Sequence, residues 1–309
     1  MENLLSLAFD NLSSYDGPKV RKGLRQVEGL LAQICLSSSG GRDEAESDGY
    51  HNGDEGEDEA PASPPRKDLG QLAQDPAFRE FFKLQEGFEW NVGLRLISTL
   101  DRLMAKGGDG QNDLLILSAL DLLQGAMLLH PPTKGLFQPP PSCSPLGKSL
   151  TLSTFQLLLD LLEPFNCPAI QSATLLTLVV ALIDVPANTR VFEALDGLLT
   201  VTSLFKARAT SREVKLKLVE FLYFYLMPET PSIPRAERRD SLPDMLQRSP
   251  SKLAGAFGGG AARGGDRRAL VAGTLATAEK QQLLSRYLSN VEDLVRDLRT
   301  CAPFGGVVA

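Results

Sequence analysis

Apolar residues recur at helical spacing along most of this chain, and three such segments follow one another between residues 168 and 226. The first, residues 170–184, is apolar on nearly every face, which predicts a helix that is covered on all sides. The second, residues 188–205, has apolar positions three and four residues apart, with Gly197 where two helices could pack closely. The third, residues 211–226, begins basic and ends aromatic. We therefore expect consecutive layers of packed helices.

These segments also repeat along the sequence. Placing the first segment on the third superposes Leu176 on Leu218, an offset of 42 residues. Placing an earlier segment on the first superposes Ser118 on Ser172, an offset of 54 residues, and the proline-rich residues 138–147 explain the difference as an insertion. Helical repeats of about 40–47 residues are typical of armadillo and HEAT proteins. The sequence thus predicts an all-α, armadillo/HEAT-like helical solenoid, with an irregular helical bundle as the alternative.

The remaining patterns divide the chain into further parts. Two amphipathic segments at the start would cap the stack, because the last layer of a solenoid has no neighbour to cover it. An amphipathic segment at the end would dock on the stack or on another chain. Two strongly polar tracts are predicted to be disordered insertions. The expected parts are an N-terminal helical cap (1–37), an acidic linker (38–72), the repeats (73–227), a basic, glycine-rich loop (228–275), a C-terminal amphipathic helix (276–300) and a tail (301–309).

The charge distribution and the cysteines indicate which kinds of partner and which cellular compartment to expect. The net charge is −6, but residues 43–59 alone hold nine carboxylates and no Lys or Arg, so the acidity belongs to the linker. Charge therefore predicts no nucleic-acid partner. The four cysteines lie far apart, which indicates reduced thiols. We expect no secretory leader and no membrane span, hence a soluble protein of the cytoplasm or nucleus.

The residue patterns of familiar enzyme chemistry are missing from the sequence. None of the four cysteines is followed six positions later by the Arg of a phosphatase loop. Residues 147–149 resemble the end of a phosphate-binding loop, but position 142 is Ser and no strand precedes it. His51 and His130 are distant from each other, and His130 falls at a helix end, where the dipole would favour its charge. We expect no catalytic residue, metal, cofactor or small-molecule substrate; a helical hydrolase or transferase without a recognisable motif is the enzyme alternative.

A basic patch on the third repeat helix is the candidate partner-binding surface. In armadillo stacks this helix contributes to the concave surface, so the patch would meet an acidic partner segment. The alternative is a solvated face without a partner. The patch consists of Arg208, Arg212, Lys215 and Lys217.

Three serines in the polar tracts are candidate phosphorylation sites. Ser63 and Ser249 each precede a proline and have a basic residue three positions on, the pattern read by proline-directed cyclin-dependent kinases. Ser241 has Arg238 three positions before it and Pro243 two after it. That spacing suits a basophilic kinase followed by capture of the phosphate by a 14-3-3 protein, and an unmodified basic loop is the alternative.

Two runs of the sequence resemble a known family. One is residues 188–229, from Asn-Thr-Arg-Val-Phe to Leu-Met-Pro-Glu, and the other is residues 279–299, from Glu-Lys-Gln-Gln-Leu to Val-Arg-Asp-Leu-Arg. Both resemble the fungal cell division control protein 14 family of the septation initiation network, which shares its name with an unrelated phosphatase. The resemblance covers most of the chain beyond the acidic tract, together with the N-terminal pair of segments, and skips the glycine-rich loop.

This resemblance implies a non-catalytic subunit with a protein partner. It implies binding to a sterile-twenty-like Ser/Thr protein kinase, and action with scaffold proteins of the spindle pole body in septum formation and cytokinesis. The expected location is then the cytoplasm and the spindle pole body. A generic armadillo-type adaptor for transport or trafficking is the alternative, although the single Trp90 does not supply the ladder of inward Asn and Trp residues that such adaptors use.

Overall fold

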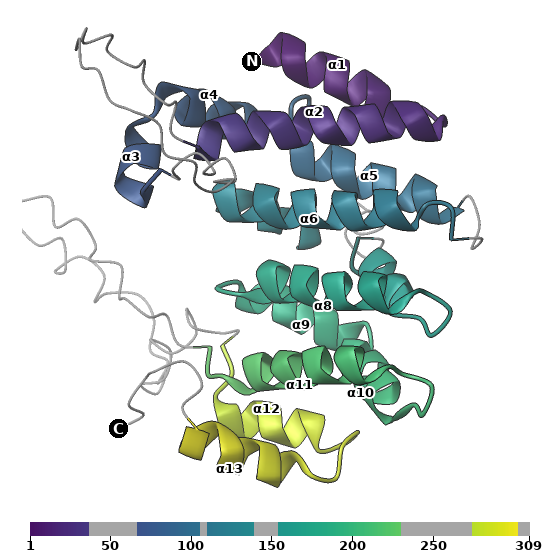
Figure 1. The fold of residues 1–309 in the computed structure, drawn as a ribbon. Helices are drawn as coiled ribbons and strands as arrows, with labels where there is room; N and C mark the ends of the chain where they lie inside the picture. Colours follow the sequence, from purple (N-terminus) through teal and green to yellow (C-terminus); the bar gives the residue numbers. More distant parts are fainter. Residues whose placement is uncertain (37–66, 106–109, 139–153, 230–273, 302–309) are drawn as a thin grey trace, which may run out of the picture.

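The structure is a computed structural model that describes residues 1–36, 67–105, 110–138, 154–229 and 274–301. The described residues form helices and no β-strand, which confirms the all-α prediction. The helices stack in layers that follow the order of the chain, from α1 at one end to α13 at the other (Figure 1). This is the layered arrangement expected of a helical solenoid.

One row of helices runs through the centre of the stack. Each helix of this row packs on the next one, and together they bury the largest part of the apolar core. Apolar side chains on both flanks of each helix make this possible, since a central helix has a neighbour above and below. The row consists of α2 (Gly17–Cys35), α6 (Asp113–Leu129), α8 (Pro168–Leu182) and α11 (Arg212–Leu226).

Shorter helices pack beside the central row. α1 (Glu2–Leu12) pairs with α2, and α5 (Val92–Ala105) pairs with α6. The segments that accompany α6, α8 and α11 are the 3-10 helix η1 (Pro131–Phe137), α9 (Pro186–Ala194) and α10 (Gly197–Lys206). Residues 154–161 are also helical, and two short helices, α3 (Leu69–Gln74) and α4 (Pro76–Gln85), precede α5.

A chain of buried aromatic rings links successive layers. The ring centroids of Phe137 and Phe155 lie 5.0 Å apart, those of Phe155 and Phe192 lie 6.5 Å apart, and those of Phe192 and Phe221 lie 5.7 Å apart. All four side chains are buried. Each such pair is worth about 0.5–1.5 kcal/mol beyond the burial of its surface. The rings thus join residues from η1 to α11 into one core.

The positions of the buried residues in the central helices give repeat offsets that differ from those expected from the sequence. α8 and α11 have 15 residues each, and their buried positions coincide when Thr174 is placed on Leu218, 44 residues apart. The predicted pair, Leu176 and Leu218, does not match, because Leu176 is 53% exposed and Leu218 is fully buried. Between α6 and α8 the burial patterns coincide when Leu120 is placed on Leu175, 55 residues apart.

Two segments that the sequence suggests as single helices are each divided in two. The segment 188–205 breaks between α9 and α10 at Asp196, which has a left-handed φ of 58°. The Phe192 ring of α9 packs directly against Gly197, the first residue of α10. This close contact is made where the chain turns from α9 into α10. The C-terminal helix predicted over 276–300 is divided into α12 (Thr277–Leu284) and α13 (Val291–Cys301). Lys206 donates a hydrogen bond to the backbone carbonyl of Tyr287 in the turn between them.

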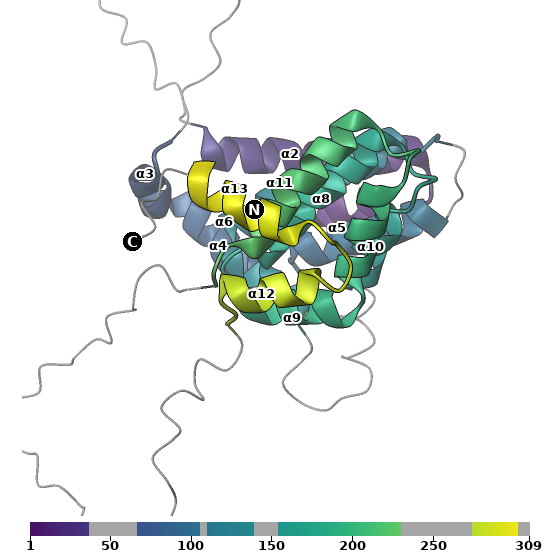
Figure 2. The same ribbon diagram turned by 90° about the horizontal axis from the view of Figure 1, so that it is seen from below.

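The C-terminal helices cover the end of the stack within the same chain. Both α12 and α13 pack on α11, and Figure 2 shows them lying across the last layer. Leu284, Leu288 and Val291 are buried there. The alternative, docking on another chain, is not needed to cover their apolar side.

His130 follows the last residue of α6, as expected, but its side chain is buried. Burial lowers the pKa of His130, whereas the nearby Glu86 carboxylate acts to raise it. Its Nδ1 lies 2.8 Å from Thr133 Oγ1, and its ring meets the Phe82 ring edge-on at 4.5 Å. Its Nε2 has no partner among the described residues. Burial therefore disfavours the charged imidazole, which corrects the expectation of a charge favoured by the helix dipole.

We predict that Gly197→Ala destabilises the protein by about 1–3 kcal/mol, because an added Cβ would overlap the Phe192 ring. Gly29→Ala is the matched control: Gly29 lies in the exposed middle of α2, where an added Cβ meets nothing within 4 Å. That variant should be neutral or more stable by up to about 1 kcal/mol. Urea unfolding followed by circular dichroism measures both, and equal stabilities would contradict the close packing at Gly197.

We predict that the protein becomes less stable as the pH is lowered, and that His130 causes part of this loss. Its pKa is lower in the folded state than in the unfolded state, so the unfolded chain takes up the proton first as the pH falls below about 6.5. Thermal unfolding between about pH 7.5 and about pH 5.5 should show a smaller loss of stability for His130→Gln than for the natural chain. His51→Gln, which changes the other histidine, is the control and should keep the natural slope. Equal slopes for all three proteins would contradict a neutral His130.

Candidate partner-binding groove and the buried ion cluster

An open groove lies between the end of α10 and the first turns of α11. Its volume is about 640 Å³. Leu216 on its wall is 60% exposed, and it adjoins the half-buried Phe205 and Val219, so the groove has an apolar floor. A second pocket, near the start of α2, has only about 20 Å³, room for about one water molecule. The groove is lined by Phe205, Arg212, Glu213, Lys215, Leu216 and Val219.

Local hydrogen bonds fix the two walls of this groove. Ser211 is the N-cap of α11, and its hydroxyl accepts a hydrogen bond from the Val214 backbone N–H at 3.2 Å. Thr210 donates from its hydroxyl to the Leu204 carbonyl of α10 at 2.7 Å. The short loop between the helices is thereby tied to both of them, so the groove is formed before a partner arrives.

The structure separates the four residues of the predicted basic patch. Arg212 and Lys215 line the groove, whereas Arg208 is exposed in the loop that precedes α11 and is not on the helix. Lys217 is not among the lining residues and forms an exposed ion pair with Glu220 at 2.8 Å. Among the described residues, the structure gives no ion pair to Arg208, Arg212 or Lys215.

The apolar part of the groove was not predicted from the sequence. Leu216 and Val219 read as ordinary apolar positions of an amphipathic helix, and Phe205 as the end of the preceding one. Their partial exposure depends on how α10 meets α11, which periodicity does not specify. The candidate phosphorylation sites Ser63, Ser241 and Ser249 lie outside the described residues.

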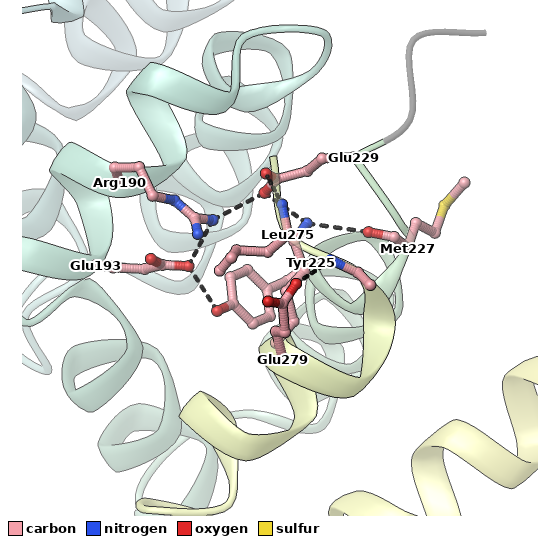
Figure 3. Close-up of polar contacts among 9 residues, drawn as sticks. Arg190, Glu193, Tyr225, Met227, Glu229, Leu275 and Glu279 are labelled. Atoms are coloured by element: carbon pink, nitrogen blue, oxygen red, sulfur yellow. Dashed lines mark hydrogen bonds and ion pairs between the residues drawn. The ribbon is translucent and has the colours of Figure 1, made fainter. Parts of the chain in front are cut away.

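A cluster of buried and half-buried charged groups lies at the opposite end of α11. The carboxylate of Glu229, just after α11, accepts hydrogen bonds from Arg190 of α9 at 2.9 Å and from the Leu275 backbone N–H at 3.0 Å (Figure 3). Lys280 of α12 forms an ion pair with the same carboxylate at 2.8 Å and donates to the Met227 carbonyl at 3.0 Å. Glu229 N–H in turn donates to the Leu275 carbonyl at 3.1 Å. The cluster therefore joins both ends of the segment between residues 229 and 275.

A second carboxylate completes the cluster. Glu193 accepts hydrogen bonds from Arg190 at 2.9 Å and from the Tyr225 hydroxyl at 2.7 Å (Figure 3). The Lys280 ammonium lies 5.1 Å from the centre of the Tyr225 ring. Two cations thus face two carboxylates, so the cluster carries no net charge. We refer to Arg190, Glu193, Tyr225, Glu229 and Lys280 as the ion cluster.

Burial dominates the electrostatics of the ion cluster. Burial raises the pKa of Glu193 although the Tyr225 hydroxyl and Arg190 act against it, and burial together with the Glu193 hydrogen bond raises the pKa of Tyr225. Lys280 is only 4% exposed, and burial lowers its pKa more than Glu229 raises it. Each charge therefore depends on its partners to remain ionised inside the fold.

The fold and the groove define a class of protein: a layered all-helical protein with an open, partly apolar groove, beside cations that form no ion pair within the described part of the chain. Within that class, the chain belongs to the family described as "Cell division control protein 14, SIN component", which matches residues 1–304. SIN stands for the septation initiation network, so family membership indicates a role related to septation in cell division.

A relative in Schizosaccharomyces pombe, named "Cell division control protein 14", is 27% identical over 314 residues. The similarity spans 99% of this chain and 97% of that protein. No solved structure matches the chain. Of the helices that the structure describes, none is both long and apolar enough to span a membrane.

We predict that Lys280→Met destabilises the folded chain by about 1.5–3 kcal/mol, because it removes one of the two cations that balance the Glu193 and Glu229 carboxylates and leaves Arg190 alone with both. Lys217→Met removes an ammonium from an exposed pair of similar length and should cost at most about 1 kcal/mol. Chemical unfolding gives both values, and limited proteolysis should cut the Lys280 variant faster around α12. Similar costs for the two variants would contradict the importance of the ion cluster.

Proposed function

We propose that this chain is a non-catalytic regulatory or scaffold subunit of a sterile-twenty-like protein kinase in the septation initiation network. In this role it promotes septum formation and cytokinesis. The observation that carries the proposal is the family match, which extends over residues 1–304 and so includes the stack and its C-terminal cover. The S. pombe relative supports it by matching along nearly its whole length.

The placement of the perturbed ionisable groups supports a role without catalysis. Shifted pKa values in an enzyme are expected at groups that face a substrate-sized cleft. Here the Tyr225 hydroxyl donates to Glu193, and Lys280 pairs with Glu229 and donates to the Met227 carbonyl. These three groups therefore engage other residues of the protein and hold α12 against α11. The groove at α10 and α11 is lined by other residues, and its mixture of apolar and cationic side chains suits a protein segment.

The proposal includes a place of action and further partners. The subunit would bring the kinase to scaffold proteins of the spindle pole body. Phosphorylation at Ser63, Ser241 or Ser249 would link this to the cell cycle, with a 14-3-3 protein as the reader of phosphorylated Ser241.

We predict that affinity purification of the tagged chain from dividing cells retains a sterile-twenty-like kinase in near-equal amount after a moderate-salt wash. Quantitative mass spectrometry measures the ratio. A complex reassembled with a kinase that lacks its own ATP-binding lysine should form normally and show no phosphotransfer, because this chain supplies no catalysis.

Two results would contradict the proposal. Recovery of diverse cargo proteins in place of a kinase would favour the transport adaptor, and phosphotransfer or another turnover by the chain alone would favour an enzyme. Loss of septation without the protein, combined with a bound kinase, is the result expected here.

A further inference from the structure

We propose that the groove between α10 and α11 binds a segment of the partner kinase that combines an apolar anchor side chain with Asp or Glu carboxylates. This inference rests on the proposed function, since it names the chemistry of the segment by which the kinase is bound. It is carried by a comparison of two layers of the same stack and by the charges around the groove.

The equivalent groove of the preceding layer is sealed by the chain itself. With the 44-residue offset, Gln171 of α8 takes the position of Lys215 of α11. Gln171 is buried and donates hydrogen bonds to the carbonyls of Leu162 and Glu163, at the end of the preceding helix, at 3.4 and 3.0 Å. Lys215 has no corresponding hydrogen bond in the described structure. The two layers share one backbone plan, but at this position Gln171 ties α8 to the preceding helix and Lys215 does not tie α11 to α10.

The apolar side chains of the open layer lack cover. The position of Leu216 is taken in α8 by the half-buried Ser172, whose hydroxyl oxygen is covered by protein. Leu216 instead exposes 60% of its surface beside the half-buried Phe205 and Val219. Covering an apolar side chain of this size yields about 1.5–3 kcal/mol. A partner's apolar side chain would gain that energy by entering the groove.

The charges of the groove select an acidic occupant. Arg212 stands at the first position of α11 and Lys215 in its next turn, near the positive end of the helix dipole. Cations there are unfavourable for the helix by about 0.3–1 kcal/mol each, so they do not serve its stability. Arg208 adds a third cation in the adjoining loop, and Glu213 is the acid among the lining residues. Carboxylates of a bound segment would pair with these cations and relieve the repulsion.

The same features disfavour nucleic acid as the occupant. A phosphate backbone would meet Glu213 at the groove and would leave Leu216 uncovered. A protein segment satisfies both kinds of side chain, because apolar and acidic residues can alternate along it.

The test compares groove variants with a matched control on the full-length chain. The variants are Leu216→Ser and the double substitution Arg212→Glu with Lys215→Glu. The control is Lys217→Glu, which reverses a charge on the same helix outside the groove. Affinity for the recombinant partner kinase is measured by titration, and circular dichroism confirms that each variant is folded. The groove variants should bind at least about tenfold more weakly, and the control within about twofold.

Crosslinking identifies the occupant directly. A photoreactive amino acid at position 216 should capture a kinase segment that contains Asp or Glu beside an apolar residue. Capture of a basic or neutral segment would overturn the inference. So would loss of binding when the kinase is dephosphorylated, because the cations would then read phosphate in place of carboxylate.

The failure of this inference can be distinguished from that of the proposed function. Full kinase affinity in all the groove variants would overturn the groove as the docking site while leaving the subunit role intact. Absence of kinase binding by the natural chain would overturn both.

Discussion

The Glu229 carboxylate is the group on which the docking of the C-terminal helices onto α11 depends. It bonds Arg190 of α9, Lys280 of α12 and the Leu275 backbone, so three distant stretches of the chain meet at one group. Without this contact, α12 and α13 would be held by apolar packing and by the hydrogen bonds that Lys280 and Lys206 donate to backbone carbonyls. A buried ion pair adds little net stability compared with apolar packing, but a broken one is costly. The ion cluster therefore fixes which surface the C-terminal helices cover.

The arrangement of α11 connects this constraint to binding. One end of the helix is held by the ion cluster and covered by α12 and α13, and the other end borders the groove. The buried side of α11 continues the aromatic chain through Phe221. A partner that binds in the groove would thus contact a helix that is already held in place, so little conformational entropy would be lost on binding.

The sequence predicts the elements better than their register or their long-range contacts. Periodicity identifies α8 and α11 and a repeat near the right length, because the apolar positions are so frequent. The predicted offset of 42 residues also superposes Pro186 on Pro228, and this register was wrong because the two prolines are not equivalent. Pro186 begins α9, whereas Pro228 follows the end of α11. The ion cluster could not be predicted, since its charges lie far apart in the chain and resemble solvated side chains. Arg212 and Lys215 were identified as candidates, but their apolar neighbours emerge only from the packing of α10 against α11.

Hydrogen–deuterium exchange of the chain, alone and bound to its kinase, shows whether the kinase covers the groove. We expect slower exchange at the end of α10 and in the first turns of α11, where the groove would be covered. We expect no change in α5, which lies in a distant layer of the stack (Figure 1). Protection confined to other layers, or no protection by the kinase anywhere in the chain, would contradict docking at the groove.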